Sequence, residues 1–366
     1  MMTAFVESCV DTVTGSARKA ERATRGRGKA KRLLRALAGK PNILVTTHIH
    51  PDPDALASCI AMRHFLRERL PDAKVDVSIR GPIGGGVNDA FNRYVNLNAL
   101  TWNPILVKQY DAVVLLDVQP NFAYNPLPQD VAATVIVDHH RSRGRRPPGE
   151  FVDIRPDIGS TCSIVFSYFM ELDVTIPPEL ATTLLYGIES DLAGAAGTPA
   201  TLDNMALSSL TLLADTQKLY QLRYVTLPQS YFVAYANGIN NATWFETVMT
   251  THIGEIDSAE SPAVIADFLL RFDPVSWTLV TATQGNKLLL SLRTRAKDRS
   301  AGDLMKRLLH KLGEGGGHRT KAGGFIAVTG ESPGEVEKHR KTLQRRLLRC
   351  LKIKDSSAKP LVSSKS

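Results

Sequence analysis

The stretch ILVTTHIHPDPDALAS, residues 43 to 58, joins an apolar run to a cluster of two histidines and two aspartates. Its first part has the β-branched, apolar character of a buried strand, and the apolar run that follows the cluster favours a helix. His48, His50, Asp52 and Asp54 therefore fall on a strand-to-helix turn. Carboxylates held this close need a cation or another offsetting interaction. A capped helix start with solvated histidines is the simpler alternative at this stage.

Further apolar runs extend the pattern along the first two thirds of the chain. Residues 111–117 and 133–138 are near-continuously apolar, which is typical of parallel strands buried on both faces. Helices are expected at 161–171, 178–188 and 202–214. Strands that alternate with helices predict an α/β domain with a doubly wound, mostly parallel sheet.

The domain organisation follows from where this pattern stops. Residues 226–245 lose helical periodicity and are expected to be a linker. Beyond them, residues 246–350 predict a second, smaller α+β domain that includes a glycine-rich loop. We expect residues 1–28 to be a basic N-terminal extension, residues 29–225 the first domain, and residues 351–366 a disordered tail.

Length and composition agree with two soluble domains. The chain has 366 residues, of which 43% are hydrophobic, enough for two cores of ordinary size. No apolar run approaches the roughly 20 residues that a membrane span needs, so no membrane partner is expected. The four cysteines are far apart and match no zinc-binding spacing, so a reducing cytoplasm is the expected location.

The net charge of +9 is distributed unevenly. Residues 17–40 and residues 338–366 each contain ten Lys or Arg and one acid, so each carries +9, and the remainder carries 9 − 18 = −9. Basic ends on an acidic body are one way to recruit polyanions. Solvated basic helices with a disordered tail are the alternative, and the sequence leaves both open.

Acidic residues and histidines end several predicted elements. Asp117 and Asp138 end apolar strands, His139 and His140 follow the second of these, and Asp191 closes a helix. Ligands of an open parallel sheet bind beyond the carboxyl ends of its strands. A single aspartate there is usually a helix cap, but several strand ends with a His-His pair favour a shared site. The side chains expected to meet at one edge are His48, Asp52, Asp54, Asp117, His139 and Asp191.

Charge balance favours a two-metal site at this edge. Four aspartates would neutralise two divalent cations, whose mutual repulsion at about 4 Å would otherwise be large. Two neutral imidazoles add ligands without adding charge, and Asp117 is the best candidate for a bridging ligand. Carboxylates mixed with imidazole and no thiol suit two Mn²⁺ ions, with Mg²⁺ or Co²⁺ as substitutes.

The order of these motifs resembles that of a known family. THIHPDPDALAS, LLDVQP, VDHH and GIESD resemble the four motifs of the DHH phosphoesterases, which are named after the Asp138-His139-His140 triplet. GGGHRTKAGG, residues 315–324, resembles the glycine-rich signature of the DHH-associated C-terminal domain. The resemblance covers about residues 29 to 330, and the chain length is similar to that of the compact, RecJ-like nanoRNA hydrolases (oligoribonucleases).

The resemblance implies roles for individual residues. The first metal would be held by His48, Asp52 and Asp117, and the second by Asp54, Asp117, His139 and Asp191. His140 would lie beside the scissile phosphate, although a purely structural hydrogen-bonding role is the alternative. Asp138 would orient a ligand histidine, as metal-binding histidines usually require. The active site would lie in a cleft between the two domains.

The second domain would hold the rest of the substrate. Backbone N–H groups of a glycine-rich loop can approach a phosphate closely, although a flexible hinge is the alternative. The residues expected to bind substrate are Gly315, Gly316, Gly317, His318, Arg319, Arg293 and Arg295. Ser160 and Thr161 open a helix and are either ordinary N-caps or an anion site.

These inferences together predict an Mn²⁺-dependent phosphodiesterase that hydrolyses short RNA or DNA oligonucleotides to mononucleotides, with 3′-phosphoadenosine 5′-phosphate as a further candidate substrate. A cyclic-dinucleotide phosphodiesterase acting on cyclic di-AMP or pApA is one alternative. A nucleic-acid-binding protein with little catalysis is another. A pyrophosphatase is disfavoured by the glycine-rich signature, and a homodimer is an option that the sequence leaves open.

Overall fold

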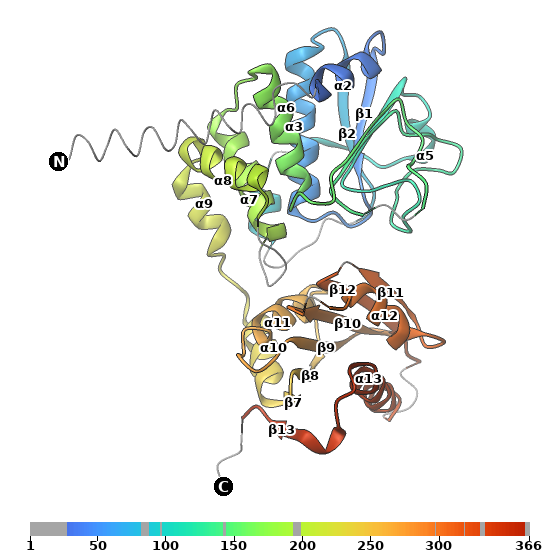
Figure 1. Ribbon diagram of the computed structural model, residues 1–366, viewed down its shortest axis with the longest axis vertical. Helices are drawn as coiled ribbons and strands as arrows, with labels where there is room; N and C mark the ends of the chain where they lie inside the picture. Colours follow the sequence, from blue (N-terminus) through green and yellow to red (C-terminus); the bar gives the residue numbers. More distant parts are fainter. Residues whose placement is uncertain are drawn as a thin grey trace, which may run out of the picture. The chain divides into compact units, whose positions relative to one another are not determined.

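The protein is described by a computed structural model in which the chain forms two compact units, the first ending at Val225 and the second beginning at Thr226 (Figure 1). The predicted N-terminal extension lies outside the described residues, apart from Gly28. The structure describes residues 28–81, 88–95, 97–141, 144–192, 199–296, 298–317, 319–329 and 334–362.

The first unit contains a six-stranded sheet in the order β3-β2-β1-β4-β5-β6. Every neighbouring pair of strands in it is parallel, so the predicted α/β class with a mostly parallel sheet is confirmed. The strands are β1 (Asn42–Thr47), β2 (Lys74–Ile79), β3 (Ala99–Thr101), β4 (Ala112–Leu116), β5 (Val135–Asp138) and β6 (Phe151–Ile154). All residues of β4 and β5 are buried, as their apolar runs predict.

The two faces of this sheet are covered differently. Successive residues of a strand point to opposite faces, and accordingly Ile43 and Val45 join one core cluster while Leu44 joins another. The first cluster includes residues of the long helices α3, α6 and α7, and the second includes Val107 of the short helix α5 and Leu127 of the loop after β4. The helices are α2 (Lys29–Leu37), α3 (Pro53–Arg69), α4 (Asp89–Tyr94), α5 (Pro104–Val107), α6 (Thr161–Leu172), α7 (Pro178–Leu192), α8 (Thr201–Leu213) and α9 (Thr216–Arg223).

The second unit contains a seven-stranded sheet in the order β11-β12-β10-β9-β8-β7-β13. Only β8 and β9 pair in parallel, and the other neighbours are antiparallel. The strands are β7 (Thr243–Phe245), β8 (Val248–Glu255), β9 (Trp277–Gln284), β10 (Lys287–Thr294), β11 (Glu314–Gly317), β12 (Lys321–Ala327) and β13 (Ala358–Pro360). The helices are α10 (Gln229–Asn240), α11 (Ser261–Leu269), α12 (Ala301–Leu309), α13 (Glu335–Leu351) and the 3₁₀ helix η2 (Asp355–Ser357).

Three segments of the second unit differ from the sequence-based expectation. The expected linker 226–245 contains α10 and β7, because Ala234 and Gly238 of this amphipathic helix pack on the sheet. The expected tail 351–366 contains η2 and β13, whose backbone pairs with β7. The expected glycine loop forms edge strand β11, which pairs with β12. The short strands β7, β11 and β13 contain too few residues for a periodic pattern to reveal them in the sequence.

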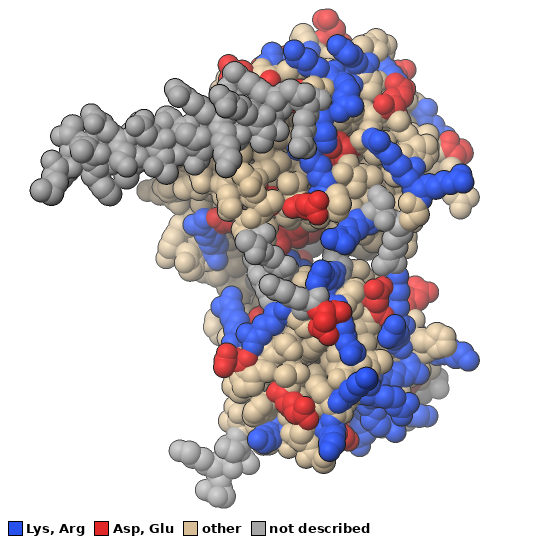
Figure 2. Space-filling model, in the orientation of Figure 1, with Lys and Arg blue, Asp and Glu red and all other residues tan. Residues whose placement is uncertain are grey.

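Surface charge and hydropathy complete the description. Figure 2 shows Lys and Arg side chains gathered on the second unit over the region where Figure 1 places α13. Among the described residues, no helix combines the length and the apolarity that a bilayer crossing requires.

Candidate metal centre

Asp117 follows β4 directly and is the central residue of the candidate site. Its side chain is buried, with 2% of the residue exposed, and its backbone has a φ of 57°. This left-handed conformation is uncommon for residues other than glycine but is tolerated by aspartate. The Asp117 N–H donates to Val137 O at 2.9 Å, and Thr161 Oγ1 donates to Asp117 Oδ1 at 2.7 Å. These bonds hold the carboxylate at the carboxyl edge of the sheet.

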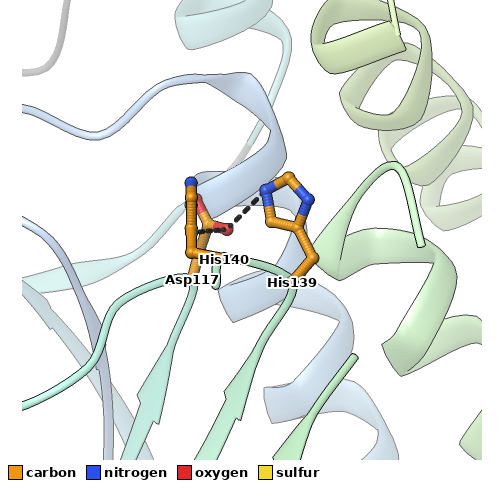
Figure 3. Close-up of side chains that lie close together, drawn as sticks. All are labelled: Asp117, His139 and His140. Atoms are coloured by element: carbon orange, nitrogen blue, oxygen red, sulfur yellow. Dashed lines mark ion pairs between the residues drawn. The ribbon is translucent and has the colours of Figure 1, made fainter. Parts of the chain in front are cut away.

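Three histidines surround this carboxylate. His48 Nε2 lies 3.5 Å from Asp117 Oδ2, and His139 Nε2 lies 3.5 Å from Asp117 Oδ1. His140 Nδ1 lies 3.7 Å from the same Oδ1 atom, and Figure 3 shows His139 and His140 on two sides of Asp117. The structure thus brings together residues from the ends of β1, β4 and β5.

Backbone carbonyls fix the orientation of two of these histidines. His48 Nδ1 donates to Ile49 O at 3.0 Å, and His139 Nδ1 donates to Ile158 O at 3.3 Å. A carbonyl oxygen only accepts hydrogen bonds, so Nδ1 carries a proton in both rings. In both rings Nε2 therefore faces Asp117 and is the atom available to a metal. Imidazoles that bind a metal are commonly held in this way.

His140 has a different partner. Its Nδ1 atom and its backbone N–H both donate to Asp138 Oδ1, at 2.7 and 3.1 Å. Gln119 Nε2 donates to Asp138 Oδ2 at 2.6 Å and to His140 O at 3.0 Å. Asp138 is fully buried. Asp138 therefore orients His140. The resemblance implied that it would orient a metal-binding histidine, and the histidine expected to bind metal here is His139.

Asp54 is held by the next helix along the sheet edge. The fully buried Asp54 side chain accepts from Thr161 N at 2.8 Å and from Cys162 N at 2.9 Å. The N-terminus of α6 therefore does bind an anion, but this anion is the Asp54 carboxylate. Ser160 is the N-cap of α6, since its side chain accepts from Ser163 N.

The two remaining acids lie on either side of this arrangement. Asp52 is the N-cap of α3, and its Oδ1 accepts from Ala55 N at 3.0 Å. Asp191 lies near the end of α7, with Oδ2 at 3.3 Å from His139 Nε2. Asp52 can cap α3 and still bind a metal, because each carboxylate oxygen has two lone pairs.

The ligand atoms form three overlapping groups, in each of which they lie within 4.8 Å of one another. Each group could hold a metal ion, and Asp117 and His139 each belong to two of them. The groups are His48, Asp52 and Asp117; Asp54, His139 and Asp191; and Asp117, His139 and His140. All six side chains that the sequence analysis expected to meet are in one place, and His140 is a further neighbour.

The electrostatics of the cluster show an excess of negative charge. Burial opposes the charged form of His48, but its hydrogen bond to Asp117 and the charge of Asp52 outweigh this and raise its pKa to about 9. Burial and the charge of Asp117 raise the pKa of Asp54 well above its ordinary value. Without a cation, the crowded negative charge therefore favours the protonated forms of Asp54 and His48. Divalent cations would replace those protons.

Most of the residues predicted to bind substrate belong to the second unit and lie within the described part of the chain. Gly315 and Gly317 lie in β11 and pack too tightly for a side chain, because a Cβ would come within 2.5 Å of Leu309 Cδ1 and 2.4 Å of Lys321 O respectively. Gly316 differs, since a Cβ at this position would have Lys306 Cε as its nearest neighbour, at 3.7 Å. His318 lies outside the described residues.

The three arginines named for substrate binding differ in their contacts. Arg293 Nε donates to Asp267 Oδ1 at 3.0 Å, and Arg295 Nη2 donates to Asp273 O. Arg319 is exposed. Arg293 and Arg295 therefore hold partners of their own unit, and Arg295 and Arg319 are both exposed.

Sequence reasoning missed Gln119 and, although it named Thr161 as an N-cap or anion site, it did not predict the bond from Thr161 to Asp117. Gln119 bridges Asp138 and the His140 backbone, and Thr161 links Asp117 to the start of α6. Gln119 stands two residues after Asp117 in the LLDVQP motif, which is a signal that could have been read. The bond from Thr161 to Asp117 joins residues 44 positions apart and has no such local signal.

Comparisons with known proteins agree with this geometry. Residues 42–188 match the family described as the DHH family, N-terminal domain. This segment belongs to the DHH family. The DHH domain thus contains five of the six clustered ligands, with Asp191 three residues beyond the match.

Individual relatives cover different parts of the chain. An uncharacterized protein from Methanocaldococcus jannaschii is 29% identical over 291 residues, which are 79% of this chain and 59% of the relative. A probable manganese-dependent inorganic pyrophosphatase from Streptococcus mutans is 30% identical over 161 residues, which are 41% of this chain and 47% of the relative. The chain therefore spans about half the length of these curated relatives.

The DHH domain and the second unit also resemble a solved structure. An exopolyphosphatase-related protein from Bacteroides fragilis superposes with a TM-score of 0.71 at 18% identity. The match covers 88% of this chain and 96% of that chain. At this level of identity, the likeness shows a shared fold.

Proposed function

We propose that this protein is a metal-dependent phosphodiesterase that hydrolyses short oligonucleotides to mononucleotides. The observation that carries the proposal is the convergence of His48 and His139 on the buried carboxylate of Asp117. Membership of the DHH family supports it, as does the resemblance of GGGHRTKAGG to a substrate-binding signature.

The donor set fits two hard divalent cations. Four aspartates and two imidazoles with Nε2 facing inwards are ligands that suit Mn²⁺, and several relatives are named manganese-dependent. His48, Asp52 and Asp117 would hold one ion, and Asp54, His139, Asp191 and Asp117 the other. When bound, such ions act as Lewis acids and lower the pKa of coordinated water.

His140 is the residue that we expect to contact the substrate phosphate. Asp138 accepts the hydrogen bond from Nδ1 of His140, which fixes the ring and places Nε2 on its far side. Burial opposes the charged form of His140, but Asp117 and Asp138 outweigh this and raise its pKa to about 9. A protonated His140 would donate from Nε2 to a phosphoryl oxygen or to the leaving group.

In the second unit, the part of the proposal that concerns substrate binding rests on Gly316 and Arg319. A Cβ on Gly316 would meet only Lys306 Cε, at 3.7 Å, so packing does not demand glycine here, and a backbone without a side chain lets a phosphate approach closely. Arg319 is exposed and carries the positive charge that such a contact requires. Like Gly316 and Arg319, the residues His318, Gly315, Gly317, Arg293 and Arg295 stay predictions as substrate contacts.

Inorganic pyrophosphate is a second candidate substrate. It is favoured by the match of the DHH domain to probable manganese-dependent inorganic pyrophosphatases, at 30% identity for the Streptococcus mutans protein. That match covers only 41% of this chain, so it gives no support for the second unit. The two candidates share the metal-binding residues and differ in what the second unit would contact.

A substrate panel tests the proposal. The full chain is incubated with Mn²⁺ and di- to pentanucleotides of RNA and DNA, cyclic di-AMP, pApA, 3′-phosphoadenosine 5′-phosphate and pyrophosphate. We expect mononucleotide release from the linear oligonucleotides, abolished by Asp117→Ala and by chelation. The matched control is Asp111→Ala, at an exposed position before β4. Turnover of pyrophosphate alone would replace the proposal with the second candidate, and no turnover of any compound would end it.

A further inference from the structure

Helix α13 has an asymmetric distribution of charge. It carries six Lys or Arg residues and two acids, and both acids, Glu335 and Glu337, lie in its first turn. Beyond Glu337 the helix contains no acid. The charge is therefore concentrated in the last three quarters of the helix, where Figure 2 shows basic side chains gathered on the surface.

Five exposed basic residues of this segment lie in one row. They are spaced by three or four residues, so at 100° per residue they fall within an arc of about 80° on one face of the helix. We call this row the α13 stripe; its members are Lys338, Lys341, Arg345, Arg349 and the C-cap residue Lys352. Leu343 and Leu347 lie on the opposite face and are fully buried in the core.

Other basic residues of α13 contact neighbouring elements or acids, whereas the side-chain contacts of the stripe stay within the helix: Lys341 pairs with Glu337 at 3.5 Å, and Arg345 Nε donates to Lys341 O at 3.2 Å. Arg340 pairs with Glu337 at 2.8 Å, and Arg346 donates to His310 O at 3.0 Å and to the last turn of α12. In the described part of the chain, no carboxylate lies within ion-pair distance of Arg345 or Arg349. Folding of this unit thus makes little use of the stripe.

The stripe also opposes helix stability. Like charges four residues apart repel each other, as Lys341 and Arg345 do, and Arg345 and Arg349 do. The helix dipole favours a basic residue in the last turn, which accounts for Arg349 alone. A partner that carries negative charges in a row would remove this repulsion.

The chemistry of the partner follows from the shape of the stripe. It extends for about 20 Å, with neighbouring charges about 5–6 Å apart at Cβ, and a polymer with regularly spaced phosphates matches such a row. A lipid surface matches less well, because the apolar face that would enter a bilayer packs against the protein's own core through Leu343, Leu347 and Leu348. The stripe contains no aromatic residue for base stacking.

We propose that the α13 stripe binds the sugar-phosphate backbone of nucleic acid. Phosphate contacts carry no sequence information, so binding is independent of sequence and falls steeply with salt. A dinucleotide is too short to span the row, so affinity rises with the length of the strand. The proposal is independent of the hydrolytic function, since phosphate binding by Lys and Arg needs no metal.

The test measures binding by the full chain in EDTA, so that the strand stays intact. A fluorescent single-stranded RNA of 20 nucleotides is titrated at several KCl concentrations. Removing three stripe charges in K338Q/R345Q/R349Q should reduce the slope of log K against log[salt] by about 2 and weaken binding at least about tenfold near 0.1 M salt. The matched control K74Q/K108Q/K218Q removes the same charge from exposed positions of the first unit and should change affinity by about twofold or less.

Two outcomes would overturn the proposal. Either the stripe variant has the affinity and the salt slope of the wild-type protein, or the control variant loses as much affinity as the stripe variant. Thermal unfolding of both variants establishes that they are folded. Dinucleotide hydrolysis in Mn²⁺ is measured in parallel: if the wild-type protein binds RNA through the stripe but hydrolyses nothing, the proposed function fails and this proposal stands.

Discussion

Thr161 donates its side-chain hydroxyl to Asp117 Oδ1 at 2.7 Å, which ties the first residue of α6 to the residue that follows β4. The same residue donates its backbone N–H to Asp54 Oδ2 at 2.8 Å. One residue at a helix N-terminus thus positions two of the proposed metal ligands. The arrangement makes α6 part of the support of the candidate metal centre.

Replacing the Thr161 hydroxyl should weaken metal binding without unfolding the protein. Thr161→Val keeps the shape of the side chain and removes the bond to Asp117, and loss of such supporting bonds typically lowers metal affinity or activity about 10- to 100-fold. Isothermal titration with Mn²⁺ measures the effect. Thr161→Ser, which keeps the hydroxyl, should retain most of the Mn²⁺ affinity. The control is Thr183→Val, which removes a buried hydroxyl bonded to Glu179 O in α7. Equal affinities for Thr161→Val and wild type would contradict the supporting role.

Asp54 and Asp191 should differ in what their loss does to the metal-free protein. Asp54→Asn loses one of the two oxygens that accept from the α6 backbone, and loss of a helix cap costs about 1–2 kcal/mol. Asp191→Asn removes no such cap. Urea unfolding in EDTA should therefore show a lower free energy of unfolding for Asp54→Asn alone, while Mn²⁺ affinity falls in both variants. Equal stability of the two variants would refute the capping role of Asp54.

The buried ion pair of Asp153 should make the first unit less stable in acid. Burial would raise the pKa of Asp153, but Arg155 and Lys29 outweigh it and hold the pKa below its ordinary value. Tyr168 also donates to Asp153 Oδ2, at 2.8 Å. Because the folded-state pKa is depressed, this contribution is present above the unfolded-state value of about 3.9 and is lost as the pH falls through the folded-state pKa.

A substitution isolates this contribution. Asp153→Asn should be less stable than wild type at pH 7, and the difference should shrink as the pH falls below about 4, where the wild-type carboxylate becomes protonated first in the unfolded state and, at still lower pH, in the folded state. Urea unfolding at a series of pH values measures both quantities. A difference between the two proteins that stays constant from pH 7 to pH 3 would show that the ion pair contributes no pH-dependent stability.

Adjacent glycines of β11 should respond differently to alanine. A Cβ on Gly315 would lie 2.5 Å from Leu309 Cδ1 and 2.7 Å from Gly323 O, so Gly315→Ala should lower the thermal unfolding temperature. A Cβ on Gly316 would make only an ordinary van der Waals contact, with Lys306 Cε at 3.7 Å, so Gly316→Ala should fold normally but raise KM for oligonucleotides several-fold, because the methyl group blocks the approach of a phosphate. Calorimetry and steady-state kinetics separate the two effects. An unchanged KM in Gly316→Ala would remove this position from the proposed substrate site.

Several features of the candidate site were accessible from the sequence. Acids and histidines at the ends of apolar strands identify Asp117 and His139, because the carboxyl ends of parallel strands necessarily share one edge of the sheet. The proximity of His48 and Asp117 follows from the pairing of β1 with β4. The roles of these residues as metal ligands stay predictions, as does the expected cleft between the domains.

The parallel sheet and the edge at which the polar residues gather could be predicted from the sequence alone, because near-continuous apolar runs that alternate with helices are visible in short stretches of the chain. Three features became visible only in the folded protein: Asp138 accepts a hydrogen bond from His140, Asp54 accepts from the start of α6, and the glycine segment is the edge strand β11. The physical reason is that hydrogen-bond partners depend on how distant segments pack. Asp54 and Thr161 are 107 residues apart, and no local pattern specifies such a contact.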